Sequence, residues 1–207
     1  MKTKIAVFVS GGGTNLQALI DAADAGALPS GEIVLVLASS PKAYALERAA
    51  KAGIPSAVVS AKTEGSQAAA EEKMNALLAE HGVELIVLAG YLSILSEDFT
   101  RRWDKRILNI HPSLIPAFCG KGYYGLRVHE EALRRGVKVT GATVHFVNEI
   151  PDGGEILLQQ AVDVLPGDTP EVLQRRVMAE AEWKLLPRAA ELVSKQLLEE
   201  HSHVENV

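Results

Sequence analysis

The sequence has a single cysteine, Cys119, and only 5% of its residues are aromatic. One thiol cannot form an intrachain disulfide or supply the several cysteines of a zinc cage, so we expect no bound metal. The N-terminus carries no secretory signal, and a chain without disulfides is typical of a reducing compartment. A cytoplasmic location is therefore predicted.

Basic residues are not in excess either. Lys and Arg total 21 against 26 Asp and Glu, which gives a net charge of −5. The chain thus lacks the basic face that broad nucleic-acid binding requires. No apolar run approaches the roughly 20 residues that cross a membrane. We expect small-molecule partners, no nucleic acid, no membrane, and a monomer or homodimer.

What is present fits one globular domain of 207 residues, 47% of them hydrophobic. Predicted strands cover residues 4–10, 32–39, 56–60, 83–90 and 106–111, and predicted helices separate the first four. This alternation defines βαβ units, and hence an α/β fold with a Rossmann-like, mainly parallel twisted sheet and flanking helices. Ligands of such sheets bind beyond the carboxyl ends of the strands. The rule places "SGGGTN", "LAGYLS" and "NIHPS" on one rim.

The second half of the chain has another pattern. Residues 139–150 alternate apolar and polar side chains, as an antiparallel or edge strand does, and the turn "PDGG" leads to a further strand over 155–165. A last helix of about 30 residues is predicted to start at a cap, Asp168 or Thr169, to kink at Pro187 and to end in the fraying tail "HSHVENV". We predict one domain over 1–207, with a nucleotide-binding half (1–111) and a C-terminal half (112–207).

The stretch "SGGGTN" follows the first predicted strand. Its glycines allow a sharp turn and a close approach to a ligand, while Thr14 and Asn15 add donors at a helix N-terminus, which suits phosphate. The motif is neither a P-loop nor a dinucleotide fingerprint. A tight strand–helix turn without a ligand explains these residues equally well.

The stretch "ILNIHPSLIP" places Asn109 and His111 on the same face of a strand, and Pro112 ends the strand. A buried histidine with local partners is the simpler explanation. At the carboxyl end of a strand, however, the two side chains reach the cleft. There Asn109 can donate to an oxyanion, and His111 can donate or move a proton.

Asp152 lies in "NEIPDGGE", where a turn residue is the simple explanation. Its carboxylate gains a second role if it approaches His111, because the negative charge would raise the pKa of the imidazole and orient the ring. The residues alone assign no function to Cys119, to His129 with its two following glutamates, or to the acidic stretch around Glu182.

Five stretches together resemble the phosphoribosylglycinamide formyltransferases, the folate-dependent enzymes of purine synthesis, over nearly the whole chain. They are "SGGGTN", "VLAGYLSIL", "LNIHPSLIP", "TGATVHFVNEIPDGGEIL" and "AEWKLLP". The resemblance implies the formyltransferase fold, with the folate site in the C-terminal half. It also implies transfer of a formyl group from the co-substrate 10-formyltetrahydrofolate to the amine of 5-phosphoribosylglycinamide, without a metal.

The resemblance also implies residue roles. The catalytic set would be Asn109, His111 and Asp152. The ribonucleotide would contact Gly13, Thr14, Asn15 and Glu182. The folate would contact Leu92, Ser93, Ile94, Leu95, Asn109, Asn148 and Ile150.

Two features depart from the family pattern. Gln67 stands where the family often has an arginine that helps to bind folate, and the loop Ala117–His129 is longer than the shortest form in the family. Three alternatives stay open. A formyltetrahydrofolate deformylase is expected to have an extra N-terminal domain, and a methionyl-tRNA formyltransferase a C-terminal one and a more basic surface. A non-catalytic Rossmann-type nucleotide-binding module would leave Asn109, His111 and Asp152 unexplained.

Overall fold

The strand β1 (Thr3–Val9) lies inside the sheet and is covered on both faces. The computed structural model describes residues 2–204, and within it β1 pairs with β2 on one side and β4 on the other. Ala6 and Phe8 pack against one layer of helices, while the odd-numbered residues of β1 pack against the other. Burial on both faces explains why this strand is an almost continuous apolar run.

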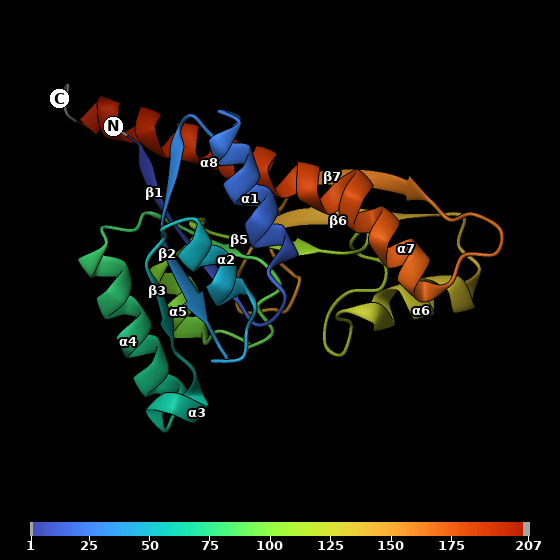
Figure 1. Ribbon diagram of the computed structural model, residues 1–207, viewed down its shortest axis with the longest axis horizontal. Coiled ribbons are helices and arrows are strands. Elements are labelled where there is room, and N and C mark those ends of the chain that lie inside the picture. The colour runs from blue at the N-terminus through green and yellow to red at the C-terminus, as the bar shows by residue number, and fades with distance from the viewer. Residues whose placement is uncertain (1, 205–207) are drawn as a thin grey trace.

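The sheet contains seven strands in the order β3-β2-β1-β4-β5-β6-β7 (Figure 1). The first five in chain order pair in parallel, whereas β6 pairs antiparallel with both β5 and β7. This confirms the predicted α/β fold, with antiparallel strands in the C-terminal part. The remaining bounds are β2 Gly31–Ala38, β3 Ser56–Val58, β4 Leu85–Leu88, β5 Ile107–His111, β6 Val139–Phe146 and β7 Ile156–Asp163.

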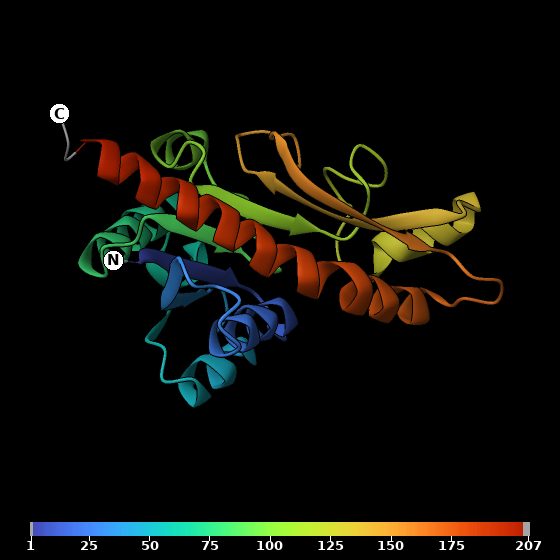
Figure 2. The ribbon, with the colours of Figure 1, turned by 90° about the horizontal axis from the view of Figure 1, so that it is seen from above.

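Helices cover both faces of the sheet. One layer buries residues of α1, α2, α6, α7 and α8, and the opposite layer buries residues of α4 and α5. Figure 2 shows α8 running along the sheet. The short helices α3 and α5 were not predicted. The bounds are α1 Thr14–Asp24, α2 Ala45–Lys51, α3 Ala61–Glu64, α4 Gln67–Glu80, α5 Glu97–Arg102, α6 Leu126–Arg135, α7 Pro170–Val177 and α8 Trp183–Val204. Across residues 2–204, every helix falls short of the length and apolarity needed to span a bilayer.

The predicted last helix is made of three consecutive parts. Thr169 caps α7 by accepting a hydrogen bond from the Val172 N–H (3.4 Å). A π turn, Met178–Glu182, joins α7 to α8, and there the Trp183 N–H donates to the Met178 carbonyl. The helix α8 continues through Pro187 to Val204. The tail predicted to fray is therefore helical at its start, and its last three residues lie outside the described residues.

Candidate active site

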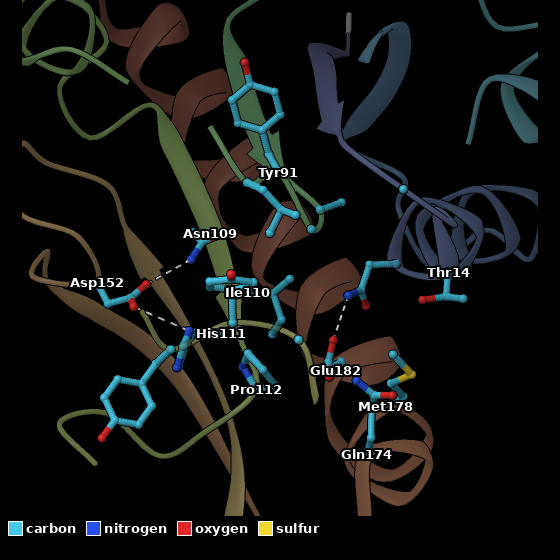
Figure 3. A pocket seen from close by; sticks show the side chains of 18 of the residues that line it. Thr14, Tyr91, Asn109, Ile110, His111, Pro112, Asp152, Gln174, Met178 and Glu182 are labelled. Atoms are coloured by element: carbon cyan, nitrogen blue, oxygen red, sulfur yellow. Dashed lines mark hydrogen bonds and ion pairs between the residues drawn. The ribbon is translucent and has the colours of Figure 1, made fainter. Parts of the chain in front are cut away.

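A cavity of about 700 Å³ opens at the carboxyl ends of β1, β4 and β5. It is lined by the glycine loop after β1, the segment after β4, and the end of β5. Figure 3 shows Asn109, His111 and Asp152 on one side, with Thr14 and Glu182 across from them. The structure thus brings together the predicted ribonucleotide and catalytic residues, which lie far apart in the sequence.

The glycine loop leaves the first turn of α1 without a side-chain cap. Gly13 is the N-cap residue, with a left-handed backbone (φ 70°). A Cβ atom at this position would lie 2.6 Å from the Cβ of Ala45, so only glycine fits between α1 and α2. The free N–H groups and the positive end of the helix dipole form a site suited to an anion.

Glu182 reaches the cavity from the π turn, and it is 5% exposed. Burial raises its pKa, and the Asn15 amide, which donates to its Oε2 at 2.7 Å, offsets part of that rise. The Asn15 Oδ1 atom is buried without a partner among the described residues. One N–H of the Asn15 amide is therefore engaged by Glu182, while its buried carbonyl oxygen has no described partner beside the cavity.

Asp152 lies between two histidines and an amide. Its Oδ2 is 3.5 Å from Nδ1 of His111, its Oδ1 is 3.5 Å from Nε2 of His145, and the Asn109 Nδ2 lies 3.4 Å from the same Oδ1. The backbone N–H of Gly120 also donates to Asp152 (2.8 Å). Asp152 has a left-handed backbone (φ 57°), a conformation that aspartate and asparagine tolerate better than most residues.

Carbonyl partners fix which nitrogen of each histidine carries its proton. The His111 Nε2 is 2.9 Å from the Phe118 carbonyl, and the His145 Nδ1 is 2.7 Å from the Phe146 carbonyl. A carbonyl only accepts, so both nitrogens donate. The His111 nitrogen that gains or loses a proton is then Nδ1, which faces Asp152.

The pKa of His111 corrects one expectation. Burial lowers it below the ordinary value, and the charge of Asp152 raises it only in part, so the predicted net rise is wrong in sign. Burial would raise the pKa of Asp152, but its contact with His145 and the charge of His111 hold it below its usual range. The carboxylate is therefore ionised at neutral pH.

Sequence reasoning did not single out His145. It pairs with Asn109 across the antiparallel strands β5 and β6, so the two side chains share a face, with Asn109 Nδ2 3.1 Å from the His145 Nε2. The inward alternation of "TVHFV" is a signal for this position, but the register between β5 and β6 is needed to place it.

A smaller hollow of about 130 Å³ adjoins the cavity and shares Asn109 and Asp152 with it. All seven residues predicted to contact folate line this hollow: Leu92, Ser93, Ile94, Leu95, Asn109, Asn148 and Ile150. Leu92, Ile94 and Ile150 are more than half exposed, which leaves apolar surface for a ligand to cover. Gln67 stabilises the segment that contains Ile94, because its Nε2 donates to the Ile94 carbonyl (3.1 Å).

The long loop after β5 covers the cluster around Asp152, where it contacts His111 and Asp152. Lys121, Tyr123 and Tyr124 of this loop line the cavity. Within residues 2–204, no three His, Cys, Asp or Glu side chains converge as ligands of a metal ion.

His129, on α6, lines the same cavity, is fully buried, and has no described partner for either ring nitrogen. Burial, with the nearby charge of His111, lowers its pKa to about 4. An unfolded histidine titrates near 6.5, so between these values only the unfolded chain binds the proton. We predict that the free energy of unfolding falls by about 3 kcal/mol as pH drops from 6.5 to 4, owing to this residue.

The measurement is denaturant unfolding at several pH values in the parent and in His129→Phe, which should lose this part of the pH dependence. His81→Gln controls for loss of a histidine elsewhere. An identical pH slope in the parent and His129→Phe would contradict the assignment.

Comparisons with known proteins agree with this geometry. The chain matches the formyl transferase family over residues 3–190 and belongs to that family. It is 43% identical over 184 residues to the phosphoribosylglycinamide formyltransferase of Haemophilus influenzae, which covers 89% of this chain and 84% of that protein. The predicted resemblance to the phosphoribosylglycinamide formyltransferases is thus confirmed.

Three further proteins show the extent of the match. The chain is 44% identical over 195 residues to the trifunctional purine biosynthetic protein adenosine-3 of Bos taurus; this is 93% of the chain, but the match spans only 18% of that protein. The crystal structure of glycinamide ribonucleotide transformylase 1 from Symbiobacterium toebii has a TM-score of 0.87 at 41% identity, covering 94% of this chain and 89% of that one. A formyltetrahydrofolate deformylase from Pseudomonas syringae shares 26% identity, with a TM-score of 0.83 over 95% of this chain and 62% of that one.

Proposed function

We propose that the protein transfers the formyl group of 10-formyltetrahydrofolate to the amine of 5-phosphoribosylglycinamide, a step of purine synthesis. The observation that carries this proposal is the shared cavity. An anion site at the start of α1 opens into the cluster around Asp152, and a partly apolar hollow adjoins that cluster. A phosphorylated amine and a folate can therefore meet at the cluster.

The amine nitrogen attacks the formyl carbon, and negative charge develops on the formyl oxygen. Asn109 and the protonated His111 are the proposed donors to that oxygen, Asn109 through the N–H that makes its longer, weaker contact with Asp152 (3.4 Å). The bond from the formyl carbon to the folate nitrogen then breaks. The His111 imidazolium, which Asp152 orients, gives its Nδ1 proton to the folate nitrogen, and the proton lost by the amine then restores the imidazolium. A neutral amine is already a nucleophile, so positioning and charge stabilisation supply most of the catalysis.

Formyl transfer from 10-formyltetrahydrofolate to glycinamide ribonucleotide, measured beside a reaction without the amine, tests the proposal. We expect formylated ribonucleotide in the first reaction and little free formate in the second. Formate released at the same rate in both would instead identify a deformylase, with water replacing the amine.

Asn15 offers a test of whether the ribonucleotide and the folate bind to different parts of the site. Asn15→Leu removes the partner of the buried Glu182 and the free Oδ1 beside the anion site, so we predict weaker ribonucleotide binding, by roughly tenfold or more. Folate affinity should stay within about twofold of the parent, because Asn15 does not line the smaller hollow. Calorimetry showing equal losses for both ligands would contradict this division.

A further inference from the structure

The helix α2 holds the glycine loop from behind. The Ala45 N–H donates to the Gly11 carbonyl (3.1 Å), and Nε of Arg48 donates to the Gly12 carbonyl (2.8 Å). In a trans peptide the C=O and the following N–H point in opposite directions. Two carbonyls fixed toward α2 therefore turn the N–H groups of Gly12 and Gly13 away from α2. In the described part of the chain, these two N–H groups have no acceptor.

Arg48 is itself held in place on three sides. Its Nη1 donates to the Gln17 Oε1 (3.0 Å), and its guanidinium lies 5.2 Å from the centre of the Tyr44 ring. It thus links α2, the loop and α1 through one planar group. Lysine cannot reproduce this arrangement, because it has a single nitrogen and no fixed fork of donors.

Arg48 acts from outside the substrate cavity. It is half-buried and is not among the residues that line the large cavity. Instead it lines a second hollow of about 470 Å³, beside Gln17 and Trp183, which meets the large cavity at Thr14. Its contacts with the loop are therefore to the carbonyl side, and the N–H side stays free for a ligand.

We infer that Arg48 is a positioning residue for phosphate binding: it fixes the peptide planes of the glycine loop so that the N–H groups of Gly12 and Gly13 face a phosphate monoester. The positive charge behind the loop adds to the attraction. This inference rests on the proposed ribonucleotide substrate, and it explains how a loop without a lysine or arginine of its own can bind a dianion.

The test compares Arg48→Gln, Arg48→Lys and, as a matched control, Lys51→Gln. Lys51 lies one turn further along α2, 5.9 Å from the same Tyr44 ring, so its removal takes away a nearby charge without touching the loop. For Arg48→Gln we expect KM for the ribonucleotide to rise on the order of 10- to 100-fold, with kcat and folate KM within about twofold. Arg48→Lys should lose most of the same affinity, and Lys51→Gln should match the parent.

A second readout does not depend on formyl transfer. Inorganic phosphate binding, measured by calorimetry, should weaken in Arg48→Gln and Arg48→Lys by factors similar to those in KM. If the proposed reaction is absent, phosphate affinity still tests the loop. Full recovery in Arg48→Lys would mean that charge alone matters, and unchanged phosphate affinity in Arg48→Gln would overturn the inference.

A fourth variant, Gln17→Met, keeps the inference testable if Arg48→Gln does not fold. Gln17→Met keeps the guanidinium charge but removes the acceptor that orients it, so the phosphate affinity should fall in the same direction by a smaller factor. If Arg48→Gln unfolds early and Gln17→Met binds phosphate like the parent, the positioning role is refuted.

Discussion

Turnover of the Asp152→Asn variant is expected to fall by roughly 10³, while the protein keeps its fold. Asparagine has the same shape and tolerates the left-handed backbone of this position (φ 57°), so the turn is preserved. The change removes the negative charge that faces Nδ1 of His111 and Nε2 of His145. The loss should therefore appear in catalysis and not in the melting temperature. Asp163→Asn, at the exposed end of β7, is the matched control and should retain full activity.

The pH dependence of Asp152→Asn tests the coupling between Asp152 and His111 more directly than turnover at a single pH. Asp152 raises the pKa of His111 against the lowering by burial, so its removal should lower that pKa further. Less His111 imidazolium then exists at neutral pH, so activity that depends on the imidazolium should drop there. This activity should recover in part as the pH falls. The measurement is the NMR titration of His111 in the parent and in Asp152→Asn. An unchanged midpoint would refute the coupling and leave Asp152 as a turn residue.

Asn109→Ala should lower turnover by roughly 10² to 10³, about 3 kcal/mol or more, which is the usual effect of removing one oxyanion donor. The folded protein loses less, about 1 kcal/mol, because Asp152 keeps the Gly120 N–H as a donor and stays near both histidines. Steady-state kinetics and thermal unfolding of the same sample separate the two effects. A variant that melts several degrees early but turns over normally would show that Asn109 is structural.

Much of this site could be predicted from local patterns. The period of two residues in a strand puts Asn109 and His111 on one face, and the rule for parallel sheets brings the glycine loop to the same rim. The partner His145 could not be predicted in this way, because its place opposite Asn109 depends on the register of two strands that lie far apart in the sequence. The short helices α3 and α5, of four and six residues, are too short for a periodic signal.

The sign of the His111 shift was also beyond sequence reasoning. A nearby carboxylate can be guessed from a motif, but burial depends on how the chain folds over the ring. Here the loop after β5 supplies the Phe118 carbonyl and the Gly120 N–H, which enclose the His111–Asp152 pair. The resulting loss of hydration outweighs the attraction of the carboxylate, so the pKa moves down instead of up.

The π turn between α7 and α8 holds one residue more than a regular helix would. Successive residues of an α-helix are about 100° apart, and a π turn closes with one residue more than an α-helical turn. Deleting one residue from Met178–Glu182 would therefore let the turn become α-helical while the 22 residues of α8 keep nearly the same rotation relative to α7. The apolar face of α8 would stay in place, but the side chains of the turn, Glu182 among them, would have to move. The extra residue thus matters for where Glu182 lies in the cavity, and less for how α8 packs.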